Sequence, residues 1–221
     1  MKNRTRILSV ALSLMAGGLT PRAGAETKPG SPAAGTSAAP YQIDAKKSRF
    51  IVETETSGLS TMFAHDHRIE VRDFGGQATF TRGQTRSGSL QLTARAKSLV
   101  LIGEDNLGAR QAIESTLRED VLETDKYPEI TFKTKSVTSS RRGDGTFDVR
   151  LIGELNLHGV TRQITVPARV SLEPGTLHAI GVLELRQTDF NITPFSFANG
   201  TVGIKDVVTL SFDIVATQTQ S

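Results

Sequence analysis

Long stretches of alternating apolar and polar residues place the strongest limit on how this chain can fold. The alternation is clearest in five segments: Phe50–Glu55, Leu90–Lys97, Thr146–Leu157, Ile164–Leu172 and Val208–Ile214. Successive side chains of a strand point to opposite faces of a sheet, so a period of two places one face in a core and the other in water. The pattern therefore predicts long, half-buried strands in an antiparallel sheet.

Weaker strands and a single helical segment complete the predicted elements. Less regular alternation, which raises the predicted total to eight or nine strands, occurs at 65–71, 76–81, 129–137 and 178–187. Glycine-containing turns are expected between strands at Gly75-Gly76, Arg142–Gly145, His158-Gly159 and Pro174-Gly175. Only Leu107–Leu122 has helical spacing, and Pro128 returns the chain to an extended form. One helix, or two short ones, is expected to cross an open end.

The simplest fold for these elements is all-β: an extended antiparallel up-and-down barrel of about eight strands. Closure removes the exposed edges of an open sheet, and a two-sheet sandwich is the main alternative. A strand of about 12 residues spans roughly 40 Å, and a tilt of about 40° shortens this to roughly 30 Å along the barrel axis. The interior of such a barrel is either filled by side chains or encloses one elongated ligand. The alternation and the strand lengths are compatible with both arrangements.

The first 40 residues are expected to lie outside the barrel. Residues 1–25 have a basic start, an apolar run and the small-residue triplet Ala23-Gly24-Ala25, which is typical of a secretory signal peptide cleaved after Ala25. Residues 26–40 are rich in Pro, Gly, Ser and Ala and are predicted to be a flexible linker. The barrel domain is expected over 41–217 and a short tail over 218–221. The prediction is a periplasmic or secreted protein with no stable membrane span after signal removal.

Charge and cysteine content exclude several classes of function. The net charge is +3, but the signal segment holds four of the 26 Lys and Arg and none of the 23 acids, so the remainder has 22 minus 23, or −1. A nucleic-acid partner is not expected, because it would require a basic stripe. The absence of cysteine excludes disulfides, thiol catalysis, thiolate metal sites and lipid attachment through a cysteine.

Four segments resemble a known family of secreted bacterial proteins, the YceI-like family. They are Lys126–Thr134, Gly153–Thr161, Thr188–Asn191 and Lys205–Asp213, within a match from about Tyr41 to Ala216. Two departures are Phe190-Asn191, where many members have Phe-Gly, and Phe63-Ala-His-Asp-His67, which resembles one branch of the family. The resemblance implies a lipocalin-like barrel that binds a polyisoprenoid or similar long-chain lipid along its axis.

The apolar faces of the predicted strands form the candidate ligand-binding set, and their alternative role is simply core. The residues expected to point inward are Phe50, Val52, Leu90, Leu92, Ile130, Phe132, Val149, Leu151, Leu155, Ile164, Val166, Leu210 and Phe212. An enclosed isoprenoid chain would gain about 0.8 kcal/mol per buried CH₂. The predicted set also includes Phe63, His65 and His67, because a polar head group is expected near the end that carries the two histidines.

The two histidines allow three interpretations. His65 and His67 are two residues apart, so on a strand both rings point to the same face. They line the polar mouth or cap a turn, contact a ligand head group, or hold zinc, copper, nickel or iron with a third ligand from His158 or a carboxylate. His158 itself is expected in a tight hairpin on the polar face. His178 is expected at the surface and Asp189 as a turn-capping carboxylate.

No catalytic residues are predicted, because the chain has no Gly-x-Ser-x-Gly elbow, no cysteine and no phosphate-binding loop. The predicted function is non-enzymatic binding of a long-chain amphiphile, a polyisoprenoid or isoprenoid quinone, with no other cofactor. The alternatives are a metal-binding or redox protein that uses His65 and His67, and a structural or stress-response secreted protein without a ligand. The pattern allows a homodimer, and no exposed apolar stripe requires one.

Overall fold

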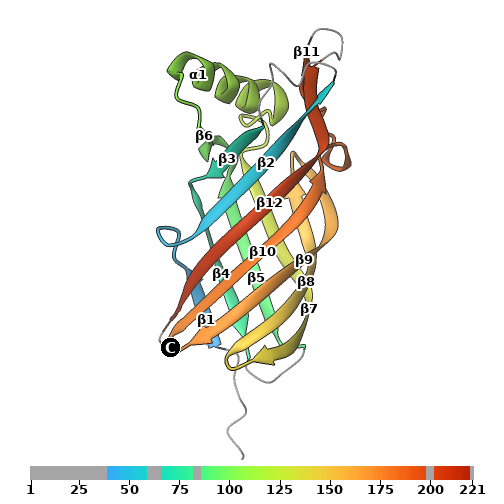
Figure 1. Ribbon diagram of the computed structural model, residues 1–221. Helices are drawn as coiled ribbons and strands as arrows, with labels where there is room; N and C mark the ends of the chain where they lie inside the picture. The colour runs from blue at the N-terminus through green and yellow to red at the C-terminus, as the bar shows by residue number, and fades with distance from the viewer. Residues whose placement is uncertain (1–38, 59–65, 82–85, 198–201, 220–221) are drawn as a thin grey trace, which may run out of the picture. The chain divides into compact units, whose positions relative to one another are not determined.

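The alternating segments form a β-barrel in the computed structural model, which describes residues 39–58, 66–81, 86–197 and 202–219 (Figure 1). The expected signal peptide and most of the expected linker lie outside these residues. The first strand begins at Ala39, two residues before the predicted start of the domain.

The described chain contains twelve strands and four short helical segments. The strands are β1 (Ala39–Ile43), β2 (Arg49–Gly58), β3 (His67–Val71), β4 (Phe74–Phe80), β5 (Gly88–Arg95), β6 (Leu99–Ile102), β7 (Glu129–Gly143), β8 (Thr146–Leu157), β9 (Val160–Glu173), β10 (Thr176–Arg186), β11 (Ser196–Phe197) and β12 (Val202–Gln218). The helical segments are η1 (Ala96–Ser98), α1 (Leu107–Thr116), η2 (Leu117–Val121) and η3 (Gln187–Phe190).

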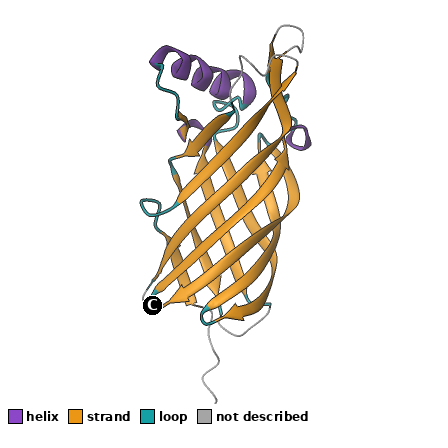
Figure 2. Cartoon of the chain, viewed as in Figure 1, coloured by secondary structure: helices purple, strands orange, loops and turns teal. Residues whose placement is uncertain are grey.

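Eight strands close into an antiparallel ring in the order β1, β4, β5, β7, β8, β9, β10 and β12, and β12 pairs back to β1. The other long pairing of β12 is with β2, so β1 and β2 lie end to end along the same edge of β12. In the same way, the pair of β3 with β6 continues the pair of β4 with β5 along the barrel. This closed up-and-down meander confirms the predicted barrel and excludes the sandwich (Figure 2).

Two-residue turns connect the strands of three hairpins. His158 and Gly159 have φ angles of 52° and 73°, so both adopt the left-handed conformation of a hairpin turn whose twist matches that of the strands. Gly145 and Gly175, with φ angles of 68° and 73°, occupy the second position of the other two turns. The turns that end β7 and β9 lie at one end of the barrel, which we call the hairpin end, and α1 lies at the other, the helical end (Figure 1).

The helix completes the wall at the helical end. It starts at the cap Asn106, whose Oδ1 accepts from the Ala109 backbone N–H at 3.0 Å, and η2 continues it as one π-helical turn. The Leu101 backbone N–H of β6 donates to Glu114 Oε1 of α1 at 3.0 Å. A side chain of α1 therefore satisfies a strand edge that no further strand pairs among the described residues. The helix predicted over 107–122 is confirmed.

Candidate functional site

All thirteen apolar residues predicted to face the interior lie in the core cluster or pack against it. Phe132, Val149, Leu155 and Val166 are buried, and the other nine are partly buried. Their inward orientation is therefore confirmed, and their contact with a ligand remains a prediction. Phe63 and His65 lie outside the described residues.

The inner face is not equally covered along its length. At the hairpin end, inner side chains such as Phe80, Phe147 and Leu177 are 4–6% exposed. Closer to the helical end, half-buried inner side chains gather on neighbouring strands: Val52 of β2, Val208, Leu210 and Phe212 of β12, and Leu185 of β10. Apolar side chains of the inner face that the protein does not fully cover are a surface that an apolar ligand can cover.

Two glycines on the inner face of the barrel make room for aromatic rings. Gly181 of β10 pairs with Phe212 of β12, and a Cβ on Gly181 would lie 2.3 Å from Phe212 Cζ. Gly153 of β8 lies opposite Thr134 of β7, and a Cβ there would lie 2.5 Å from Phe132 Cζ. The outer edges of the two rings therefore occupy the space that a Cβ on each glycine would need.

His67 lies where the alternation of its strand predicts, on the inner face near the helical end. It pairs with Thr54 of β2, and the His67 backbone N–H donates to Thr54 Oγ1 at 3.3 Å. The neighbouring Asp66 accepts from the Thr56 backbone N–H at 3.0 Å. Thr54 and His67 therefore place polar groups on the inner wall near the helical end.

His158 is not on a solvent face, and that expectation was wrong. Its side chain is 8% exposed, its Nε2 lies 2.9 Å from Glu123 Oε2, and its Nδ1 lies 3.3 Å from the Phe190 carbonyl oxygen. The Tyr127 ring packs edge-on against the imidazole with centroids 4.4 Å apart. The hairpin was predictable from His158-Gly159, but Glu123, Tyr127 and Phe190 are too distant in sequence for any local pattern to indicate their contact.

A metal site gains no support from the part of the chain that the structure describes. No three His, Asp or Glu side chains gather there in a way that could hold a metal ion. Both ring nitrogens of His158 lie against oxygen atoms of its own surroundings, Glu123 Oε2 and the Phe190 carbonyl oxygen. His178 is exposed, as expected, and contacts Asp213 at 2.7 Å.

The carboxylate that caps η3 is Asp206, not the predicted Asp189. Asp206 accepts from the backbone N–H and the hydroxyl of Thr188 at 2.9 and 2.8 Å. The Thr188 backbone N–H is the main reason that the pKa of Asp206 lies below its ordinary value. Asp189 contributes its backbone carbonyl, which accepts from Arg162 Nε at 2.9 Å.

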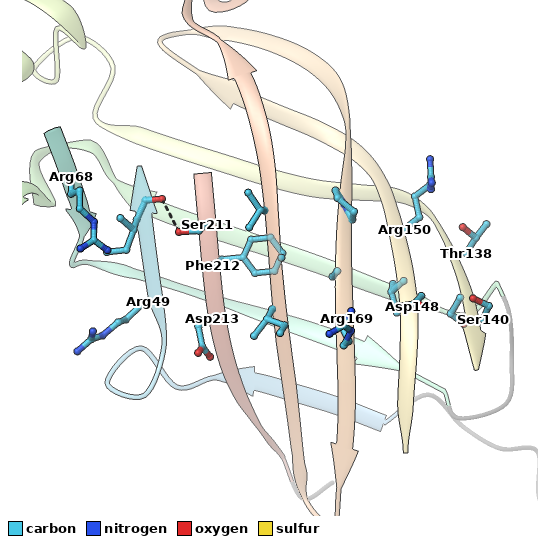
Figure 3. Close-up of a pocket in the computed structure, with 18 residues that line it drawn as sticks. Arg49, Arg68, Thr138, Ser140, Asp148, Arg150, Arg169, Ser211, Phe212 and Asp213 are labelled. Atoms are coloured by element: carbon cyan, nitrogen blue, oxygen red, sulfur yellow. Dashed lines mark hydrogen bonds between the residues drawn. The ribbon is translucent and has the colours of Figure 1, made fainter. Parts of the chain in front are cut away.

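A groove of about 890 Å³ crosses the outer face of the barrel over β7, β8, β9, β10, β12 and β2 (Figure 3). Its rim includes Arg49, Arg150 and Arg169, for which no ion pair is found within the described ranges. Of the predicted ligand-binding residues, only Val149 and Phe212 border it. Because most of its lining belongs to the outer face, this groove is not a surface that a chain enclosed in the barrel would contact.

A second cavity, of about 620 Å³, lies between β9 and β10 toward the helical end. Its lining combines inner residues, Ile164, Leu183 and Leu185, with the outer residues Gln163 and Glu184. Ile164 belongs to the predicted set. Because the lining includes both faces of both strands, this cavity lies within the wall of the barrel.

Comparisons with known proteins agree with this architecture. The model of the YceI-like domain matches residues 41–216. A UPF0312 protein of Pseudomonas putida is 30% identical over 131 residues, which cover 59% of this chain and 62% of the relative. A UPF0312 protein of Vibrio parahaemolyticus is 30% identical over 135 residues, 61% and 64% of the two chains. The chain thus matches less than two thirds of the length of these curated relatives.

Solved structures share the fold at low sequence identity. BcnA of Burkholderia cenocepacia has a TM-score of 0.61 at 21% identity and covers 79% of this chain and 99% of its own. A polyisoprenoid-binding domain of Saccharophagus degradans, implicated in plant cell wall breakdown, has a TM-score of 0.58 at 16% identity, with 83% and 100% covered. None of the helices in the described ranges is long and apolar enough to cross a bilayer.

Proposed function

Because the chain belongs to the YceI-like family, we propose that it is an exported binding protein that encloses the hydrocarbon chain of a polyisoprenoid or an isoprenoid quinone in its barrel. The observation that carries the proposal is the group of half-buried apolar side chains on the inner faces of β2, β10 and β12. Covering such surface contributes about 25 cal/mol per Å² of apolar area, so a long prenyl chain needs no polar group to bind. The polyisoprenoid-binding neighbour with the same fold supports this ligand class.

The proposed role requires no chemistry at the ligand, and the site fits that role. The described inner face is mainly apolar, and Thr54 and His67 add polar groups near the helical end, where a head group would lie. Export to the periplasm is proposed from the sequence of residues 1–25.

The first test is native mass spectrometry of the chain purified from a bacterial periplasm without detergent, followed by organic extraction. The expected result is an added mass of several hundred daltons that matches a prenyl lipid or quinone in the extract. Protein that carries no lipid, and that also fails to bind added prenyl lipid, would contradict the proposal. That result would favour the alternative of a structural or stress-response protein without a ligand.

A pair of variants locates the lipid. Leu210 and Ser211 are neighbours on β12, and Ser211 pairs with Val182 on the outer face of β10. Leu210→Glu places a carboxylate among the inner side chains and is expected to reduce bound lipid at least tenfold. Val182→Glu places the same group on the outer face, where Val182 is 56% exposed, and is expected to leave binding unchanged.

A further inference from the structure

The ladder between β9 and β10 stops halfway. The two strands pair from Thr176 with Glu173 to Ile180 with Arg169, although both continue toward the helical end. Their two-residue hairpin directs the N–H groups of odd-numbered β9 residues toward β10. Pro167 occupies the next such position and has no N–H to donate, so pairing ends there.

Both β9 and β10 remain paired with their other neighbours where the ladder between them is missing. Over the same stretch β9 pairs with β8 as far as Val160, and β10 pairs with β12 as far as Arg186. A Cβ on Gly181 would lie 2.4 Å from the Pro167 carbonyl oxygen, so the two strands are in close contact where they begin to separate. The opening is thus bounded by two strands that their other neighbours hold in place, and it is a feature of the wall rather than a frayed end.

The cavity between the strands leads from outside to inside. Gln163, Thr165 and Glu184 line its outer part, and Ile164, Leu183 and Leu185 line its inner part. The inner part leads to the half-buried wall of Val208 and Leu210, because Leu185 pairs with Val208 and Leu183 with Leu210. The apolar side chains of the inner part therefore continue to the inner face. Most of the remaining lining is polar and includes the charged residues Arg162, Arg186 and Asp189.

A turn closes the end of this opening. Phe190 of η3 lines the cavity and is 1% exposed. Side chains hold η3 there through its backbone: Arg162 donates to the Asp189 carbonyl, His158 contacts the Phe190 carbonyl, and Asp206 accepts from the Thr188 N–H. Phe190 therefore closes the opening between β9 and β10. Displacing it would break side-chain hydrogen bonds but no backbone ladder between strands.

We propose that the opening between β9 and β10 is a lateral binding and entry site for a single linear hydrocarbon chain, which passes through the barrel wall to the inner face. This inference rests on the proposed function. Separating neighbouring strands where they are paired would break a backbone ladder and leave its N–H and C=O groups unpaired. Between Pro167 and the end of β10 no ladder has to break, so a chain enters when side chains and η3 move.

The absence of cysteine from the sequence allows a direct test by cross-linking. Thr165 and Glu184 would be partners if the ladder continued, and Ser171 and His178 are partners in its paired half. Each pair is replaced by cysteines and closed with the same short bis-thiol reagent. Uptake of a fluorescent prenyl probe is expected to slow at least tenfold in Thr165→Cys/Glu184→Cys and to recover on reduction. The Ser171→Cys/His178→Cys control is expected to change less than twofold.

A second measurement requires no lipid. Leu183 and Leu177 are inner residues of the same strand, 9% and 6% exposed, but only Leu183 lines the opening. A small water-soluble thiol reagent is expected to modify Leu183→Cys at least tenfold faster than Leu177→Cys. Equal rates, or undiminished probe uptake by the cross-linked Thr165→Cys/Glu184→Cys protein, would overturn the lateral site alone. Failure of every form to take up the probe, cross-linked or not, would instead overturn the proposed function.

Discussion

Glycine determines where aromatic rings can lie in this barrel. Phe132 and Phe212 each cover the backbone of a glycine on a neighbouring strand, so a large side chain occupies space that a second side chain would otherwise take. The alternation predicts that both phenylalanines face inward, but it does not indicate which neighbours they cover, because cross-strand partners depend on the register.

The Gly153→Ala substitution tests this arrangement. The new methyl group would lie 2.5 Å from Phe132 Cζ and 2.6 Å from the Lys133 carbonyl oxygen, so ring and backbone must shift. We expect a loss of about 1–3 kcal/mol in the free energy of unfolding, measured by urea denaturation. Gly75→Ala is the matched control, because no atom lies within 4 Å of its Cβ position. Equal losses in the two variants would contradict the packing argument.

His158 contacts residues that are distant in sequence, and we expect these contacts to matter more for stability than the intrinsic turn preference of the residue at this position. His158→Asn creates Asn-Gly, the most favourable pair for this turn, at a φ of 52°. The variant nevertheless loses the contacts with Glu123, Tyr127 and Phe190. We expect destabilisation by about 1–3 kcal/mol in urea denaturation. His178→Asn, at an exposed site, should be nearly neutral, and a stabilised His158→Asn protein would show that the turn outweighs the contacts.

At the scale of the elements, the helix and η3 each depend on one capping side chain. The cap of η3 can be recognised only in the folded structure, because Asp206 is 18 residues from Thr188. The helix cap is local: Asn106 precedes α1 directly, in the position where asparagine side chains accept from the first unpaired N–H groups.

Asn106→Ala is expected to lower stability by about 1 kcal/mol, because the Ala109 N–H loses its acceptor. Asn106→Asp retains an acceptor and should change stability little. Thermal unfolding followed by circular dichroism compares the two, and an alanine variant as stable as the aspartate variant would rule out a capping contribution.

The attachment of η3 is expected to weaken in acid. Asp206 has a lowered pKa in the folded protein, so its contribution is complete above the ordinary value of 3.8 and decreases as the pH falls through the folded-state pKa. We expect hydrogen exchange of the Thr188 amide to be slower in the natural chain than in Asp206→Asn at about pH 6, with a smaller difference at about pH 3. A difference that is independent of pH would contradict this assignment.

For the molecule as a whole, the sequence was a good guide to the barrel and a poor guide to its opening. A period of two is a local property, so Leu151 and Leu210 could be assigned to the interior without knowledge of their neighbours. The gap between β9 and β10 leaves the alternation of both strands intact. Pro167 and Gly181 are its only local marks, and each gains meaning only when the strands are placed side by side.

Ligand removal should be visible in the stability of the whole barrel. If a prenyl lipid binds the folded state alone, free ligand at about 100 times its Kd stabilises that state by about 2.7 kcal/mol. We expect a delipidated sample to unfold at a lower temperature than the native sample and to recover when prenyl lipid is added. Leu210→Glu should show no recovery, and an equal gain in that variant would indicate binding outside the barrel.

The last strand joins the ring to its own beginning. Gln218 of β12 pairs with Tyr41, and the Thr219 backbone N–H donates to the Pro40 carbonyl at 3.1 Å. A ribosome synthesises Tyr41 long before Gln218. The growing polypeptide therefore remains an open sheet until β12 has been made, and only then does the barrel have an inside.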